Sequence, residues 1–222
     1  MLREVFNLFR RKDVVEDLTG QIARMIELGQ WMFQRVGSVL KETENWKAAE
    51  AELYEKDREI NTLEQSIRER VVAHLSVDNR MDLGPCLVLM SVVKDAERIG
   101  DYCKNIYEVG SFFEHEYTHG EFVGPLTEIR DEIDRLFPGV LKAICEDDKS
   151  GARDVTTAAR SIAQRCEMVV HQLLGLRGDF PADEAVAYVL LARHYKRVAS
   201  HLSNIATSVV SPVPLLDFPG GA

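Results

Sequence analysis

The sequence lacks an apolar run long enough to cross a membrane. Its longest such stretch, PCLVLMSVV at 85–93, has nine residues, whereas a spanning helix needs roughly 20. The amino-terminal MLREVFNLFRRKD mixes apolar and charged residues, and no small-residue cleavage site follows it, which argues against a secretory signal. We therefore expect a cytoplasmic protein without a transmembrane helix.

The same amino-terminal segment is basic and amphipathic, a pattern typical of helices that lie on a membrane surface. This pattern allows two interpretations, peripheral contact with a membrane or packing of the segment on the protein itself. The residues that make the pattern are Leu2, Val5, Phe6 and Phe9 on the apolar side and Arg3, Arg10, Arg11 and Lys12 on the basic side.

Cysteine is also scarce, and its spacing excludes two kinds of site. The four cysteines show no CxxC pairing and lie in apolar helical runs, so neither a zinc site nor a disulfide framework is supported. We expect all four to behave as small buried hydrophobic residues. They are Cys86, Cys103, Cys145 and Cys166.

Positive charge is outnumbered, with 27 Lys and Arg against 36 Asp and Glu and a net charge of -9. This balance argues against nucleic acid as a partner, because binding to phosphates needs a cationic surface. The sequence has no G-x-S-x-G elbow, no Walker loop and no H-E-x-x-H zinc helix. We therefore expect a protein that is not an enzyme.

Six segments carry the three-to-four-residue apolar periodicity of amphipathic helices, and none shows the two-residue alternation of a strand. Breaks rich in Gly, Pro, Asp and Asn separate the segments. The sequence therefore predicts an all-α fold. The predicted helices are 13–42, 46–75, 85–116, 126–146, 151–176 and 181–210.

The break YTHGEFVGP, at 117–125, divides the six helices into two groups of three. A shift of 99 residues places ERIGDYCKNIYE, from Glu97, over KRVASHLSNIAT, from Lys196, so that two arginines and two Asn-Ile pairs coincide. We therefore predict two tandem three-helix bundles, packed either at a right angle or side by side. The predicted repeats cover 1–118 and 119–222.

Acidic and amide side chains form a stripe beside the apolar face of the second predicted helix and another on the third. If these helices are neighbours, the stripes converge, and their mutual repulsion is relieved when a cation joins them. Oxygen ligands suit Mg²⁺, Mn²⁺ or iron. The alternative is that both stripes are solvated faces with Arg and Lys neighbours. The stripes consist of Asp57, Asn61 and Glu64, and of Glu97, Asp101, Asn105 and Glu108.

A glycine, Gly100, interrupts the third predicted helix between its acidic and apolar faces. A glycine inside a helix costs about 1 kcal/mol relative to alanine. We therefore expect another backbone or a ligand to approach closely at this position.

The segment DAERIGDYCKNIYE, at 95–108, resembles the signature of the PhoU family of phosphate-uptake regulators. In that family an acid-x-x-x-Asp motif followed by Asn-Ile lies on the third helix of each of two three-helix bundles. DREINTLEQSI, at 57–67, resembles the family's second-helix motif. The resemblance implies a homodimeric regulator of phosphate uptake and phosphate-starvation signalling. Its implied partners are the ATPase of a phosphate transporter and a membrane sensor histidine kinase.

In the PhoU family the paired acids are associated with iron, Mg²⁺ or Mn²⁺. By position, Glu97 and Asp101 match the third-helix pair, and Asp57 matches the second-helix acid. Asn61 stands where the family usually has aspartate, and an amide neutralises less of the metal's charge. The resemblance therefore implies one weak metal site in the first half.

The second half departs further from the family's pattern. Lys196 and Ser200 stand at the positions of the paired acids, and Ala159 and Ala163 at those of the facing acids. A lysine ammonium has no lone pair to offer a metal. We therefore expect only the scaffold to remain in this half, with the Asn-Ile pair at 204–205 in a packing role.

Three other functions stay open at this point. The protein can serve another phosphate permease as an accessory protein, or it can be an interaction bundle without any metal. A di-metal enzyme on a helical bundle is the third, but that chemistry uses two Glu-x-x-His pairs. The sequence has one such pair, Glu116 and His119, at a predicted helix end.

Overall fold

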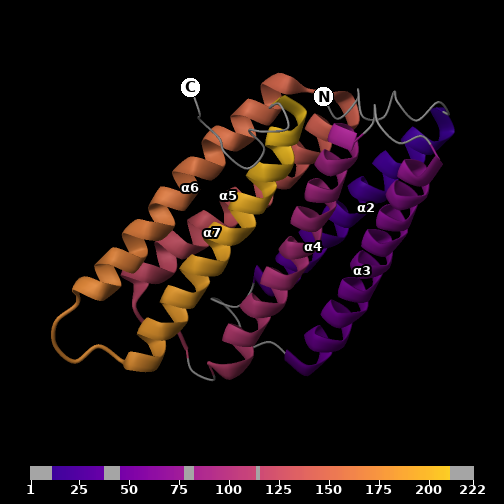
Figure 1. Ribbon diagram of the computed structural model, residues 1–222. Helices are drawn as coiled ribbons and strands as arrows, with labels where there is room; N and C mark the ends of the chain where they lie inside the picture. Colours follow the sequence, from indigo (N-terminus) through magenta and orange to yellow (C-terminus); the bar gives the residue numbers. More distant parts are fainter. Residues whose placement is uncertain (1–11, 38–45, 78–82, 114–115, 211–222) are drawn as a thin grey trace.

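The all-α prediction is confirmed. The computed structural model describes residues 12–37, 46–77, 83–113 and 116–210, and within these ranges it holds six helices and no strand (Figure 1). The helices are α2 Lys12–Val36, α3 Trp46–Val77, α4 Leu83–Phe112, α5 Gly120–Glu146, α6 Lys149–Gly175 and α7 Ala182–Val210.

The helices form two groups of three that lie side by side, with their long axes roughly aligned (Figure 1). In the first group α2, α3 and α4 contact one another, and in the second α5, α6 and α7 do so. The groups meet where α4 packs on α7 and α2 packs on α5, whereas α3 and α6 lie at opposite edges. The junction is therefore side by side. The predicted division at residue 118 stays a prediction.

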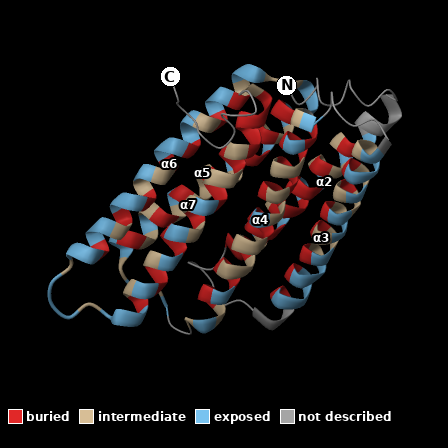
Figure 2. Cartoon of the chain, viewed as in Figure 1, coloured by how far each residue is buried: buried red, intermediate tan, exposed pale blue. Residues whose placement is uncertain are grey.

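One hydrophobic core runs through both groups, because the apolar stripes of α2, α4, α5 and α7 all face the junction (Figure 2). The ring of Phe33 on α2 lies 5.9 Å from the ring of Phe137 on α5. It also lies 5.9 Å from the ring of Tyr195 on α7, in an edge-on arrangement. All three side chains are fully buried. The two groups therefore share core residues as well as a surface contact.

The segment that leads into α5 is fastened to α7 by a buried carboxylate. The Oε1 atom of Glu184 accepts hydrogen bonds from the backbone N–H of Thr118, at 2.8 Å, and of His119, at 3.2 Å. The Tyr188 hydroxyl donates to the same oxygen at 2.5 Å. Glu184 is only 3% exposed. Burial alone would raise the pKa of this carboxyl, but these hydrogen bonds outweigh burial and lower it to about 2.

The predicted boundaries around this segment were wrong. The third helix ends at Phe112, before the predicted Glu116, and the fourth begins at Gly120 instead of residue 126. Pro125 removes the hydrogen bond that would reach the carbonyl of Glu121. Glu121 is exposed, so water can satisfy that carbonyl and the helix continues. The predicted end of the first helix, at residue 42, lies outside the described residues.

Two further expectations concern cysteine and the membrane. Cys86, Cys103 and Cys166 are buried as predicted, but Cys145 is exposed, because it lies near the end of α5 beyond the core-facing Ile144. Within the described ranges, no helix is both long and apolar enough to cross a membrane. The basic amino-terminal segment lies outside these ranges.

Candidate functional site

The acidic stripes of α3 and α4 converge, as the sequence predicts, and a lysine ammonium lies between them. The Nζ atom of Lys104 lies 2.8 Å from Oδ1 of Asp57 on α3 and 3.0 Å from Oδ1 of Asp101 on α4. The Lys104 side chain is 20% exposed, so the contact is mostly shielded from water. The two carboxylates are thus joined by a cation that the chain itself supplies.

Asn61 turns its donor side toward this cluster. Its Nδ2 atom donates to Oδ2 of Asp57 at 3.2 Å, which leaves both Asp57 oxygens with a hydrogen-bond donor. Asp101 has a second cation as well, because Nη1 of Arg98 lies 3.3 Å from its Oδ2 atom.

Two of the remaining acids of the stripes, Glu97 and Glu64, also have basic neighbours. The Lys94 ammonium lies 2.5 Å from Oε2 of Glu97, and the Arg68 guanidinium lies 2.8 Å from Oε1 of Glu64. Both pairs lie within a single helix, at spacings of three and four residues that bring side chains onto the same face. Glu108 is exposed.

The surroundings of the Lys104 ammonium favour its protonated form. Burial alone would lower the pKa of the Lys104 ammonium, but its hydrogen bonds to Asp57 and Asp101 outweigh burial and raise that pKa. At Glu97, burial raises the carboxyl pKa, and the charges of Asp101 and Glu64 raise it further, while Lys94 opposes the rise. The surroundings of Glu97 therefore disfavour the charged form of its carboxyl group.

Gly100 accommodates side chains of the neighbouring helices. A Cβ atom at this position would lie 3.3 Å from Cδ1 of Ile60 on α3 and 3.7 Å from the sulfur of Met32 on α2. The first of these distances is tighter than ordinary van der Waals contact. The expected close approach at Gly100 is thus made by core side chains and not by a backbone.

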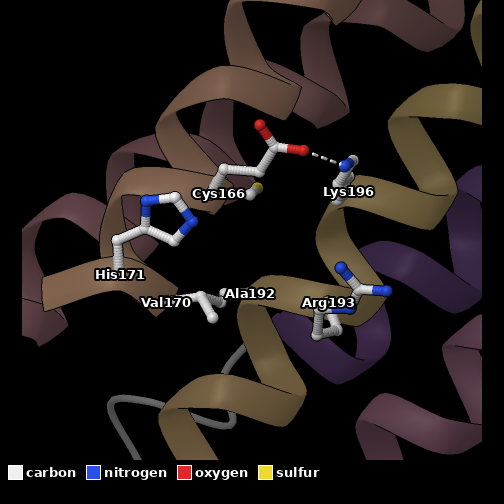
Figure 3. Close-up of a pocket in the computed structure, with 7 residues that line it drawn as sticks. Cys166, Val170, His171, Ala192, Arg193 and Lys196 are labelled. Carbon is white, nitrogen blue, oxygen red and sulfur yellow. Dashed lines mark hydrogen bonds and ion pairs between the residues drawn. The ribbon is translucent and has the colours of Figure 1, made fainter. Parts of the chain in front are cut away.

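The corresponding positions of the second half present cations around a small cavity between α6 and α7 (Figure 3). The cavity measures about 140 Å³. Lys196, at the position that matches Glu97, forms an ion pair with Glu167 of α6. Arg193 also lines the cavity, and Ser200 donates its hydroxyl to the Lys196 carbonyl at 2.8 Å. Ammonium and guanidinium groups have no lone pair for a metal.

A polar contact that the sequence did not reveal links the two halves. Oδ1 of Asp95, on α4, lies 2.6 Å from Nδ1 of His201 and accepts a hydrogen bond from Nδ2 of Asn204 at 3.2 Å, both on α7. The ring of Tyr102 stacks on the His201 ring at 5.5 Å. Ile205 is fully buried. In the Asn-Ile pair of α7, Ile205 therefore packs in the core, and Asn204 links α7 to α4.

The PhoU domain family matches this chain twice, at residues 22–109 and 126–209, which together span most of α2–α4 and α5–α7. The chain belongs to the PhoU family. A curated relative, the phosphate-specific transport system accessory protein PhoU homolog 1 of Thermotoga maritima, is 26% identical over 166 residues, which cover 70% of this chain and 69% of that protein.

Two solved PhoU structures share the fold. The crystal structure of PhoU from Pseudomonas aeruginosa superposes with a TM-score of 0.78 at 20% identity, covering 88% of this chain and 95% of that one. The phosphate transport system regulatory protein PhoU from Streptococcus pneumoniae gives a TM-score of 0.72 at 20% identity, covering 95% and 98%.

The metal implied by the PhoU resemblance does not fit the residues as they are arranged. A metal between Asp57 and Asp101 would have to displace the Lys104 ammonium, and Asn61 would have to turn its amide to offer oxygen. Among the described residues, no group of three or more His, Cys, Asp and Glu side chains is placed to hold a metal ion. Metal binding by Glu97, Asp101, Asp57 and Asn61 stays a prediction.

Proposed function

We propose that this chain is a regulatory accessory protein of phosphate transport. The observation that carries the proposal is the match of the PhoU domain to both halves of the chain. The names of its relatives agree, since the T. maritima protein is a phosphate-specific transport system accessory protein and the S. pneumoniae protein is a phosphate transport system regulatory protein.

The proposed mode of action is contact between proteins. A rigid helical body with a shared core can present long helix faces to a partner, and the net charge of -9 favours a partner surface that is basic. The partners proposed are the ATPase of a phosphate transporter and a sensor histidine kinase, both met at the cytoplasmic side of the membrane. The protein is proposed to act there as a homodimer.

Deletion of the gene in its own host tests this function. If the protein restrains phosphate-starvation signalling, the deletion strain will express phosphate-starvation genes in phosphate-rich medium. If it serves another phosphate permease, phosphate uptake will change while those genes stay silent. A plasmid copy of the wild-type gene is the control and must reverse either change. Unchanged expression together with unchanged uptake would refute the proposed function.

The enzyme alternative is disfavoured by the contacts of its best candidate residue. Nδ1 of His119 lies 2.9 Å from Oε2 of Glu184, a residue that also holds the start of α5. Glu116 is exposed. The Glu-x-x-His pair thus has a structural contact in place of the four-helix carboxylate arrangement that di-metal enzymes use.

A further inference from the structure

We propose that the first half of this protein uses the Lys104 ammonium as its resident cation, in place of a bound metal ion. The proposal rests on the position of Nζ, which lies within 3.0 Å of carboxylate oxygens on two different helices. It concerns how the α3–α4 pair is held together and does not depend on the phosphate-related function.

The geometry needs a cation at this point. Asp57 is buried and Asp101 half-buried, and their stripes face each other across the α3–α4 contact. Like charges brought together in a partly dry site destabilise one another unless an opposite charge lies between them. Lys104 bridges α4 back to α3 and supplies that charge, and Asn61 donates to the remaining Asp57 oxygen.

The cluster is complete without an added ion. One ammonium lies between the two aspartates, and the Arg98 guanidinium provides a further positive charge on the outer side of Asp101. A divalent ion bound by Asp57 and Asp101 would lie next to the Lys104 ammonium, and the repulsion between the two positive charges opposes binding. The ammonium therefore both holds the helices and excludes a metal.

The second half has a similar lysine–carboxylate ion pair at a different position. Lys196 of α7 reaches across to Glu167 of α6, so each half has a lysine on its last helix that contacts an acid on its middle helix. The two pairs differ in one respect that a test can use. Removing the Lys104 ammonium leaves two facing carboxylates, whereas removing that of Lys196 leaves Glu167 on an exposed face.

The experiment compares Mn²⁺ uptake by the wild-type chain and by Lys104→Met, which keeps an unbranched side chain, one atom shorter, and removes its charge. Free Mn²⁺ is measured by electron paramagnetic resonance, since the six-line signal of the hydrated ion weakens when the ion binds. We expect the wild type to leave the signal unchanged at micromolar Mn²⁺ and Lys104→Met to reduce it by about one equivalent.

Three variants serve as controls. Lys104→Arg keeps the charge, and Lys196→Met removes a lysine that forms an ion pair with one carboxylate, that of Glu167, among the described residues, so neither should take up Mn²⁺. Lys104→Met combined with Asp57→Asn should lose the uptake that Lys104→Met gains. In thermal unfolding, millimolar Mn²⁺ should raise the melting temperature of Lys104→Met and leave that of the wild type unchanged.

Two results would overturn the proposal. The first is Mn²⁺ uptake by the wild-type protein that disappears on Asp57→Asn, which would show that a metal and not Lys104 joins the acids. The second is a Lys104→Met protein that takes up no more Mn²⁺ than the wild type. The wild-type measurement decides the first point even if the variant fails to fold.

Discussion

The buried carboxylate of Glu184 offers a quantitative test of how the segment before α5 is held on α7. Replacing Glu184 with glutamine keeps its size but removes the charge that accepts hydrogen bonds from Thr118, His119 and Tyr188. The amide nitrogen of glutamine is a donor and faces other donors in one of its two orientations. We therefore expect Glu184→Gln to destabilise the folded protein.

The size of the effect follows from the pKa of the carboxyl, which is lowered from 4.5 to about 2 on folding. By linkage this difference is worth about 3 kcal/mol of stability at neutral pH. Because the folded pKa is the lower one, the stabilisation is complete above about pH 5 and is lost as the pH falls through 4.5 toward 2. At pH 3 roughly 1 kcal/mol should remain.

Urea denaturation of both proteins at pH 7 and pH 3 measures this change. The free energy of unfolding should differ by about 3 kcal/mol at pH 7 and by roughly 1 kcal/mol at pH 3. Asp183→Asn, the adjacent exposed acid on α7, is the matched control and should cost less than 1 kcal/mol. A penalty below 1 kcal/mol at pH 7, or one that does not shrink in acid, would refute the reasoning.

Three further predictions concern packing, the α4–α7 contact and assembly. Gly139→Ala should destabilise by about 1–3 kcal/mol in urea denaturation, because its Cβ would lie 2.8 Å from Cγ2 of the buried Val155, and adding Val155→Ala should recover part of the loss. Gly20→Ala, with nothing within 4 Å, should instead be neutral or stabilising, and equal effects at both glycines would contradict this account. Asp95→Asn should cost about 1–3 kcal/mol, because it replaces a buried carboxylate that contacts His201 and Asn204 with an uncharged amide, and the loss of stability should be absent in the exposed control Glu108→Gln. Light scattering should give a mass near twice 25.1 kDa at micromolar concentration, and a monomer mass would exclude the proposed homodimer.

The helices and their core faces could be predicted from the sequence because periodicity reports burial directly. Phe33, Ile60 and Ile99 stand at apolar positions of that periodicity in the first three predicted helices, and all three are fully buried. The start of α5 could not be predicted in this way. Its determinant, Glu184, lies on another helix 65 residues away from His119, so no local pattern around residue 120 reveals it.

The candidate site was predictable to the level of which helix faces meet. The convergence of Asp57 and Asp101 followed from the stripes, and basic residues three positions from Glu97 and Asp101 were visible as well. The sequence did not predict whether a metal ion or the Lys104 ammonium lies between the two aspartates. The outcome depends on whether the Lys104 side chain reaches from α4 to Asp57, a distance set by α3–α4 packing at Gly100 and not by spacing along either helix.

The contact between α4 and α7 has an implication for how a molecule of this kind could have arisen. In the alignment of the two halves by a shift of 99 residues, Asp95 corresponds to His194 and Tyr102 corresponds to His201. The contact between Asp95 and His201 is therefore equivalent to the contact between His194 and Tyr102, whose rings lie 6.0 Å apart. A single repeat standing alone would leave this face open to water and able to meet its own copy. A one-repeat ancestor is therefore expected to have been a symmetric pair, later fused into one chain whose formerly identical contacts were free to diverge.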